Sequence, residues 1–351
     1  MGFVLVFGFG ILDLVPTSLY AADYSQQGPF PIRTQNPVYL QTANLNPARA
    51  ESLPQGFLEL RIDQAYSNLY ERETDFNSDI NMDMELYRAS LNASYGFLPG
   101  WEAGVEIPFL RFEGGFLDSL IQNFHDFFGF PNGGRDQIPN GVFNYRIQES
   151  GLDYQIVQQS LNIGDIALNV KRQFFEETPS VPAMAFRFGA KLPSGDSDKG
   201  MGDGLPGFGL GLALEKSYKR LHGYLNLDVL VDGGNELLVP LMASTYFDFS
   251  LAGEFSLSRR TSAVVQLAGG TKRLKGTGLE TWDGVPMDLI VGAAGDWHLG
   301  HSNKTLFWQL AFSEDITSVG PAVDFTVWSS LGLRFPIHAQ DLYKGDFLSA
   351  K

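Results

Sequence analysis

The chain has 351 residues, a formal net charge of −15 and no cysteine, and 13% of its residues are aromatic. The lack of cysteine excludes a disulfide scaffold, a thiolate zinc site and a cysteine nucleophile. The aromatic content excludes a disordered chain, and the acidic balance argues against binding to nucleic acid. The length suits two soluble domains or one large closed β-barrel.

The two ends of the chain differ from its middle. Residues 1–22 combine an apolar run with small residues before Asp23, which predicts a signal peptide that is cleaved on export. The alternative is a buried element of the mature protein. Residues 23–55 are rich in Pro, Asn and Gln and predict an N-terminal periplasmic arm, and residues 336–351 lack a strand pattern and predict a C-terminal tail.

Membrane-spanning helices are not expected in the rest of the chain. After residue 22, nothing approaches the run of about 18 apolar residues that a spanning helix needs. The mean hydropathy is −0.07. Any membrane span would therefore consist of strands.

Hydrophobic and polar residues alternate with a period of two along most of the chain. Residues 87–97 and 101–109 are two such runs, joined by a short turn at 98–100. This period places all apolar residues of a strand on one face. The runs reach about ten residues, the length of a tilted strand that crosses a bilayer. A sheet in hydrocarbon must close on itself, so we expect an apolar outside and a hydrated lumen.

These runs predict an all-β fold, a single antiparallel transmembrane β-barrel of 12 strands over residues 56–335. Short and long links alternate, as in barrels with short periplasmic turns and longer outer loops. The longest link, residues 110–162, is the predicted extracellular loop, with a short helix. Residues 142–157 form either a hairpin in that loop or a strand pair that raises the count to 14. Residues 80–86 change parity before residue 87, which predicts a bulge. A soluble sandwich is the alternative fold.

Three segments resemble a known group of proteins. The arm Pro29-Phe30-Pro31-Ile32-Arg33-Thr34-Gln35-Asn36-Pro37 and the block Phe124-His125-Asp126-Phe127-Phe128-Gly129-Phe130-Pro131-Asn132-Gly133-Gly134-Arg135 resemble the bacterial family catalogued as domain of unknown function 3187. The stretch Gly164-Asp165-Ile166-Ala167-Leu168 is similar to a wider set of outer-membrane barrels. The resemblance implies an outer-membrane barrel and brings no known activity. The strand that ends at Phe335 also looks like the last strand through which the barrel-assembly machinery recognises bacterial barrels.

The helix predicted at residues 117–130 has two interpretations. Its apolar residues recur at helical spacing. It could fold inward as a constriction over the lumen, for which the candidate residues are Phe124, His125, Asp126, Phe127 and Arg135. It could instead pack on the barrel rim or lie at the outer lipid interface.

Charged residues at lumen parity are the candidates for lining a pore. They are Arg88, Glu102, Glu106, Asp165, Lys171, Arg187, Lys191, Asp228, Asp248, Asp288, Asp296 and Arg334. Opposite charges could pair across the wall and fill the barrel, or they could set a transverse field in an open pore. A barrel of this size lies between filled and open types. The acidic excess favours a slight preference for cations.

No cofactor, metal or catalytic residue is expected, because the five histidines have no metal-ligand spacing and the acidic loop at residues 193–204 departs from the EF-hand pattern. We therefore expect a protein that is not an enzyme, a passive channel or transporter for a small solute in the outer membrane of a Gram-negative bacterium. Its expected partners are outer-membrane lipid, that solute and the assembly machinery. The alternative is a non-conducting structural or adhesion-type barrel.

Overall fold

The structure is a computed structural model, and it describes residues 26–129, 139–149, 152–233, 242–274, 279–300, 303–317, 321 and 323–337. Most of these residues lie in β-strands. None of the helices within these ranges is both long and apolar enough to cross a membrane.

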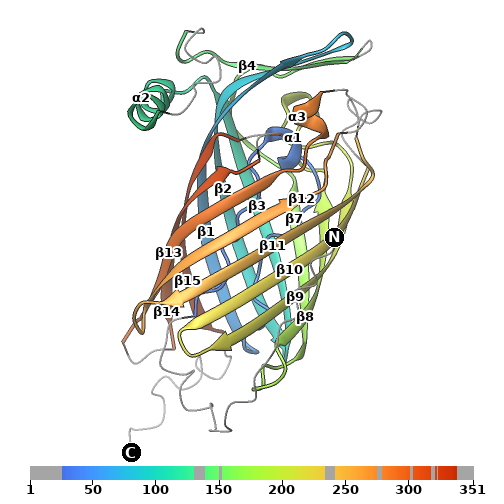
Figure 1. Ribbon diagram of the computed structural model, residues 1–351. Coiled ribbons are helices and arrows are strands. Elements are labelled where there is room, and N and C mark those ends of the chain that lie inside the picture. The colour runs from blue at the N-terminus through green and yellow to red at the C-terminus, as the bar shows by residue number, and fades with distance from the viewer. Residues whose placement is uncertain are drawn as a thin grey trace, which may run out of the picture.

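A closed antiparallel barrel forms the body of the molecule, and 12 strands of the described chain build it (Figure 1). β1 (Phe57–Thr74) pairs with β2 (Ser78–Leu98) on one side and with β15 (Phe325–Pro336) on the other, so the sheet closes on itself. From β2 the wall continues through β3 (Trp101–Glu113), β7 (Ile166–Phe175), β8 (Ala183–Leu192), β9 (Gly207–Tyr218), β10 (Leu221–Asp232), β11 (Thr245–Ser256), β12 (Thr261–Gly270), β13 (Met287–His298) and β14 (Thr305–Asp315) to β15. The predicted fold class and strand number are confirmed.

The predicted outer loop carries secondary structure of its own. Helix α2 (Asp118–Phe128) comes first, then the hairpin of β4 (Asn144–Glu149) and β5 (Leu152–Gln155), and then β6 (Gln159–Ile163). β4 pairs with the end of β2 that projects beyond the barrel. Residues 142–157 therefore contain a hairpin of the loop, and the alternative count of 14 strands is wrong.

The two faces of the wall differ as the period of two predicts. In β8, Phe186 is 61% exposed and its neighbour Arg187 is 5% exposed, and in β10 the values for Leu227 and Asp228 are 46% and 5%. Apolar side chains thus cover the outside and charged ones lie inside, the reverse of a water-soluble sandwich. Hydrocarbon favours this arrangement because the closed wall leaves its backbone groups paired within the sheet.

The links between strands define two ends of the barrel. At the lower end in Figure 1, adjacent strands are joined by short turns, such as residues 99–100 between β2 and β3 and residues 219–220 between β9 and β10. The opposite end carries α2, the β4–β5 hairpin and a 3-10 helix (Ser197–Lys199) in the link between β8 and β9. We refer to them as the short-turn end and the long-loop end.

Residues 26–55, called the arm below, run inside the barrel. Gln26 lies by the β9–β10 turn, where its side-chain amide donates a hydrogen bond of 2.6 Å to Glu215 Oε1. The arm rises to helix α1 (Pro37–Leu40) near the long-loop end and returns to Gly56 beside the β2–β3 turn. The described part of the segment predicted as a periplasmic arm thus lies inside the barrel wall.

The lumen supplies the hydrogen bonds that the arm does not make with a neighbouring strand. Pro29, Pro31 and Pro37 have no N–H group and cannot join a ladder. Instead, the side-chain amide of Gln266 in β12 accepts from Phe30 N at 2.8 Å and donates to Phe30 O at 3.0 Å. The buried arm is thus satisfied by polar side chains of the inner wall.

Inward-facing glycines make room for the arm. A Cβ on Gly209 would lie 3.1 Å from Leu45 Cδ1, and one on Gly211 would lie equally close to that atom. On the opposite side, a Cβ on Gly292 would lie 2.8 Å from the Phe30 ring. The lack of side chains at these positions lets the arm approach the wall closely.

An apolar cluster fills the long-loop end, and we call it the apolar cap. Its buried members come from α1, the long-loop ends of β1, β2 and β3, the outer loops and the segment of α3 (Glu280–Asp283). They are Val38, Tyr39, Leu40, Leu69, Ile80, Met82, Met84, Leu86, Leu110, Phe112, Tyr145, Ile147, Tyr154, Ile156, Met201, Met242, Leu274, Leu279, Trp282 and Val323. The register of β1 with β2 is unbroken from Asp79 to Tyr95. The bulge predicted before residue 87 is therefore wrong, and the parity changes because the inward face there meets the cap.

Some sequence-based boundaries fall outside the described residues. This is the case for the signal peptide at 1–22 and for residues 338–351 of the predicted tail. Pro336 still belongs to β15, and Ile337 N donates to Gly56 O at 2.6 Å. The barrel thus extends slightly beyond the predicted last residue.

Candidate functional site

The barrel lumen is the candidate site. The structure places the charged residues predicted for it inside the barrel, either buried or lining a cavity: Arg88, Glu102, Glu106, Asp165, Lys171, Arg187, Lys191, Asp228, Asp248, Asp288, Asp296 and Arg334. Their role in conduction stays a prediction.

Ion pairs join many of these residues across the inner face of the wall, between adjacent strands or over one strand. Arg187 Nη2 lies 2.5 Å from Asp228 Oδ1, and both side chains are about 5% exposed. Arg88 pairs with Glu106 in the same buried manner. A buried charge is stable only when it is paired and hydrogen-bonded, so removing one partner is strongly destabilising.

Lys191 joins three carboxylates to the arm. Its Nζ lies 3.5 Å from Asp165 Oδ2 and 3.4 Å from Asp232 Oδ2, and it also contacts Asp203. The same Nζ donates to the arm carbonyl of Gln41 at 2.9 Å. One cation cannot neutralise three carboxylates, and burial, together with the neighbouring Asp232, raises the pKa of Asp203 in the β8–β9 link to about 8.

The returning half of the arm is held at two further points. Arg49 Nη2 pairs with Glu215 Oε1 of β9 at 2.6 Å, and Ala50 N donates to Oε2 of the same carboxylate at 3.1 Å. Lys171 Nζ of β7 donates to Glu51 O at 2.9 Å. Charged groups of the wall thus bind the main chain of the arm as well as its side chains, in hydrogen bonds that charge strengthens.

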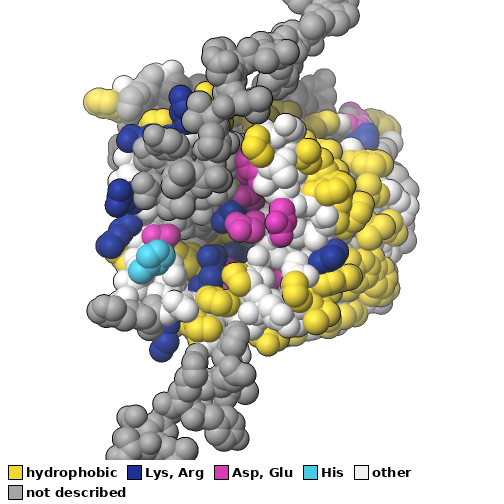
Figure 2. Space-filling model, turned by 90° about the horizontal axis from the view of Figure 1, so that it is seen from below, with side chains coloured by type: hydrophobic (Ala, Val, Ile, Leu, Met, Phe, Trp, Pro, Cys, Tyr) yellow, Lys and Arg dark blue, Asp and Glu magenta, His cyan; other side chains and the backbone are white. Residues whose placement is uncertain are grey.

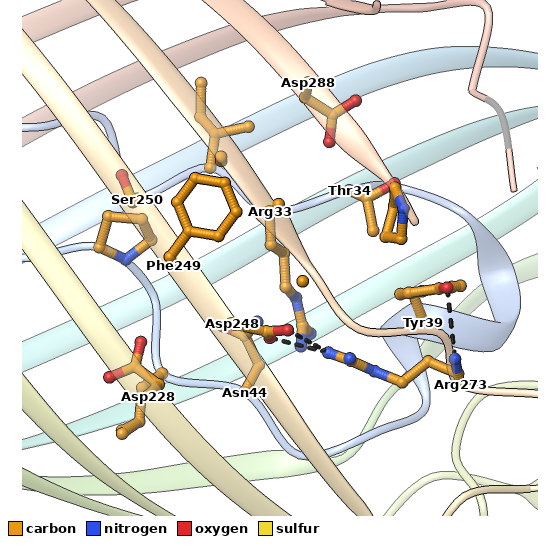
Figure 3. Close-up of a pocket in the computed structure, with 17 residues that line it drawn as sticks. Arg33, Thr34, Tyr39, Asn44, Asp228, Asp248, Phe249, Ser250, Arg273 and Asp288 are labelled. Carbon is orange, nitrogen blue, oxygen red and sulfur yellow. Dashed lines mark hydrogen bonds and ion pairs between the residues drawn. The ribbon is translucent and has the colours of Figure 1, made fainter. Parts of the chain in front are cut away.

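Arg273 is a residue that the sequence analysis did not single out. Its guanidinium pairs with Asp248 Oδ2 at 2.7 Å (Figure 3). It donates to Thr42 Oγ1 of the arm at 3.2 Å. It also stacks near the rings of Tyr39 and Tyr246, at 4.9 and 4.2 Å from their centroids. In the sequence Arg273 is one cation in a polar link, and nothing there indicates that it turns inward.

Two cavities of very different size lie between the arm and the described wall. The cavity at the short-turn end measures about 460 Å³, and its lining includes Asn46, Glu59, Arg61, Asn92 and Arg334. That volume is within the range of about 300–1,000 Å³ for small-molecule sites. The other, toward the long-loop end beside Arg33 and Asp288, measures about 50 Å³ and has room for water only (Figure 3).

The view from the short-turn end shows acidic and basic side chains close together (Figure 2). Pairing in the described lumen is incomplete: Asp288 and Arg33 take part in no ion pair with a described residue, and Asp296 accepts a hydrogen bond of 2.8 Å from the side-chain amide of Gln27. The lumen thus combines paired charges with a few that face the cavities alone.

Helix α2 does not form the predicted constriction. Figure 1 shows it at the upper left, to one side of the barrel and not over the lumen, while the projecting ends of β1 and β2 lean to the right. Its Asp126 and Phe127 are exposed. Arg135 and the side chains of Phe124 and His125 lie outside the described residues. The predicted helix is confirmed over Asp118–Phe128, but helical spacing alone does not indicate on which side of the wall a loop helix lies.

The histidine at lumen parity has a structural environment. His222 is 3% exposed, and its ring nitrogens lie 2.9 Å from Ser217 Oγ and 3.0 Å from Ser256 Oγ. Both nitrogens are engaged inside the barrel, whereas an enzyme of the barrel wall needs such a pair on the lipid side. That the protein is not an enzyme stays a prediction.

A family model described as "Protein of unknown function (DUF3187)" matches residues 14–337. The chain belongs to this family. The match spans both the arm and the barrel, and it confirms the resemblance seen in the sequence. A comparison with curated proteins finds no match.

Solved structures with a similar fold are outer-membrane barrels. The COG4313 outer membrane channel from Pseudomonas putida F1 is 13% identical with a TM-score of 0.53, over 83% of this chain and 100% of the other. The KdgM porin in complex with disordered oligogalacturonate is 8% identical with a TM-score of 0.38, over 80% and 99%. The NanC porin is 9% identical with a TM-score of 0.43, over 79% and 98%. At 13% identity, the likeness to the COG4313 channel concerns the fold alone.

Proposed function

We propose that the protein is a channel for a small polar solute in the bacterial outer membrane, and that the arm is its plug. The observation that carries this proposal is that a separate segment fills the lumen. The wall encloses a rising and a returning pass of the arm. Two extended chains with their side chains take up a width of about 10 Å, and that space becomes available to a solute when the arm leaves.

The lining supports a polar solute. The cavity of about 460 Å³ at the short-turn end brings charges of both signs together with the amides of Asn92 and Asn169. Such a lining offers donors and acceptors at once, so it suits a hydroxyl-rich or zwitterionic molecule better than an apolar one. In the outer membrane this cavity faces the periplasm, because short turns lie on that side.

A reversible lock tests the proposal. A Cβ on Gly207 would lie 2.7 Å from the Ala43 Cβ, within about 1 Å of the spacing of about 3.5–4.5 Å that a disulfide needs. Because the chain has no cysteine, the double variant Ala43→Cys, Gly207→Cys ties the arm to β9 by one bond. Planar-bilayer recordings should show current only after reduction, and the single variant Ala43→Cys should not respond to reductant.

The channel is rejected if two variants both show no current above baseline: the reduced double variant, and a variant in which the contacts that hold the arm are weakened. Liposome swelling with sugars, amino acids and small ions then ranks the solutes. The alternative function, a non-conducting structural barrel, is favoured by the density of ion pairs around Lys191 and Arg187. It requires that the double variant show no current above baseline, whether its disulfide is oxidised or reduced.

A further inference from the structure

The outer wall near helix α2 carries an unusual buried carboxylate. Glu85 lies in the projecting part of β2 and is fully buried. It accepts hydrogen bonds from Phe116 N at 2.8 Å, from Leu117 N and from the hydroxyl of Tyr66. These contacts tie the segment before α2 to β2 and to an aromatic side chain of β1.

Aromatic rings surround this anchor on the outside of the barrel. The Phe116 ring lies 5.7 Å from the Tyr66 ring, which lies 6.4 Å from the Tyr87 ring. Tyr66 and Tyr87 share the outward parity of the lipid-facing residues Ile62 and Leu91. Rings at the end of an apolar wall are typical of the belt at the membrane interface. The anchor thus places the start of α2 next to that belt.

One side of α2 is in contact with protein. Asp118 Oδ2 accepts a hydrogen bond from Gly141 N at 2.7 Å. The side chain of Asn140 donates a hydrogen bond to Ser119 Oγ and accepts one from the amide of Gln122. At about 100° per residue, positions 118, 119 and 122 lie on one half of the helix. Position 127 lies opposite, and the Phe127 side chain there is 82% exposed. The apolar positions predicted from the sequence share this opposite half.

We propose that α2 is an interfacial anchor whose apolar half lies in the outer leaflet of the membrane, beside β1 and β2. The continuity with the aromatic belt identifies lipid as the occupant. Residues 114–129 contain two carboxylates and no Lys or Arg, so apolar burial and not attraction to anionic headgroups drives the contact. This placement is independent of whether the lumen conducts.

Depth-dependent quenching tests the placement. Phe127→Cys gives a chain with one thiol, to which an environment-sensitive fluorophore is attached in dioleoylphosphatidylcholine vesicles that contain doxyl-labelled lipid. We expect quenching by the doxyl lipid at least twofold stronger than at two control positions. Phe76→Cys lies in the link between β1 and β2, where the native side chain is 94% exposed, and Gln122→Cys lies on the protein side of α2.

The fluorophore at position 76 should respond mainly to aqueous iodide, and the one at position 122 should respond weakly to both reagents. If the fluorophore at position 127 is quenched by iodide as strongly as at position 76, or by neither reagent, the helix faces water or a protein surface and the proposal fails. Glu85→Ala should reduce lipid quenching at position 127 by releasing the anchor. The measurement at position 127 in the otherwise unchanged chain decides the matter even if Glu85→Ala does not fold.

Discussion

Replacing Lys191 by methionine tests how firmly the arm is held. The change keeps most of the side-chain length but removes the charge shared by Asp165, Asp203 and Asp232, and with it the bond to the arm carbonyl. With the arm in place, the three carboxylates are 8%, 0% and 3% exposed. Their charge is then uncompensated and out of water, whereas an empty lumen lets water solvate it.

Removing one partner of a buried ion pair costs about 3–5 kcal/mol. Since about 1.4 kcal/mol corresponds to a factor of ten, the ratio of released to docked arm should rise by about two to three and a half orders of magnitude. The reporter is Val38→Cys at the tip of the arm, where the native side chain is 1% exposed and no other thiol is present. Its maleimide labelling in vesicles measures arm release.

Lys199→Met is the matched control. Its pair with Asp196 has a spacing of 2.7 Å, but both side chains are nearly half exposed, and such a surface pair contributes about 0–1 kcal/mol. Labelling of Val38→Cys should therefore stay close to that of the parent chain. Equal labelling rates in the Lys191→Met and Lys199→Met backgrounds would refute the view that this buried cluster retains the arm.

Further predictions concern pH, lipid and packing. Because the pKa of Asp203 is raised, the folded state binds its proton more tightly than the unfolded chain does, so the urea midpoint should rise as pH falls from about 8.5 to about 6, and Asp203→Asn should remove this trend. Leu251→Arg, in the middle of β11 and 53% exposed, should lower the free energy of unfolding in vesicles by about 2–4 kcal/mol, and Leu257→Arg, beyond the end of that strand, by about 0–1 kcal/mol; equal losses would contradict a lipid-facing wall. Gly209→Val should cost about 1–3 kcal/mol and speed labelling of the arm, whereas Gly253→Val, where a Cβ meets nothing within 4 Å, should not.

The barrel wall could be predicted from the sequence because each strand meets two different surroundings. Phe186 can face lipid while its neighbour Arg187 faces the lumen only if the strand lies in the wall with one fixed register. Where the surroundings change, the same rule misleads. At residues 80–86 the inward side meets the apolar cap, so the apolar residues face inward there and outward from residue 87 on. The hydrophobic pattern therefore shifts by one residue, as it does at a bulge, although the strand is unbroken.

The location of the arm could not be predicted from its own composition. Proline has no N–H group for a strand ladder, and Asn and Gln side chains form hydrogen bonds equally well in water and among the polar side chains of a lumen. The available signal lay in β9, where Gly209 and Gly211 leave the inward face without side chains. A lumen whose wall lacks side chains at these positions has space for another segment, and the arm is a segment with no predicted strand partner. The side of the wall on which α2 lies depends on Glu85, which is distant in sequence.

Helix α1 connects the two parts of the chain that fill the barrel lumen, the arm and the apolar cap. Val38, Tyr39 and Leu40 belong to the arm and are at the same time buried members of the apolar cap. Burying each such side chain contributes about 1.5–3 kcal/mol. Withdrawing the arm therefore also removes these three side chains from the cap. The arm and the cap should therefore open in a single cooperative step. For the proposed channel, planar-bilayer recordings should then contain closed and fully open levels without a stable intermediate conductance.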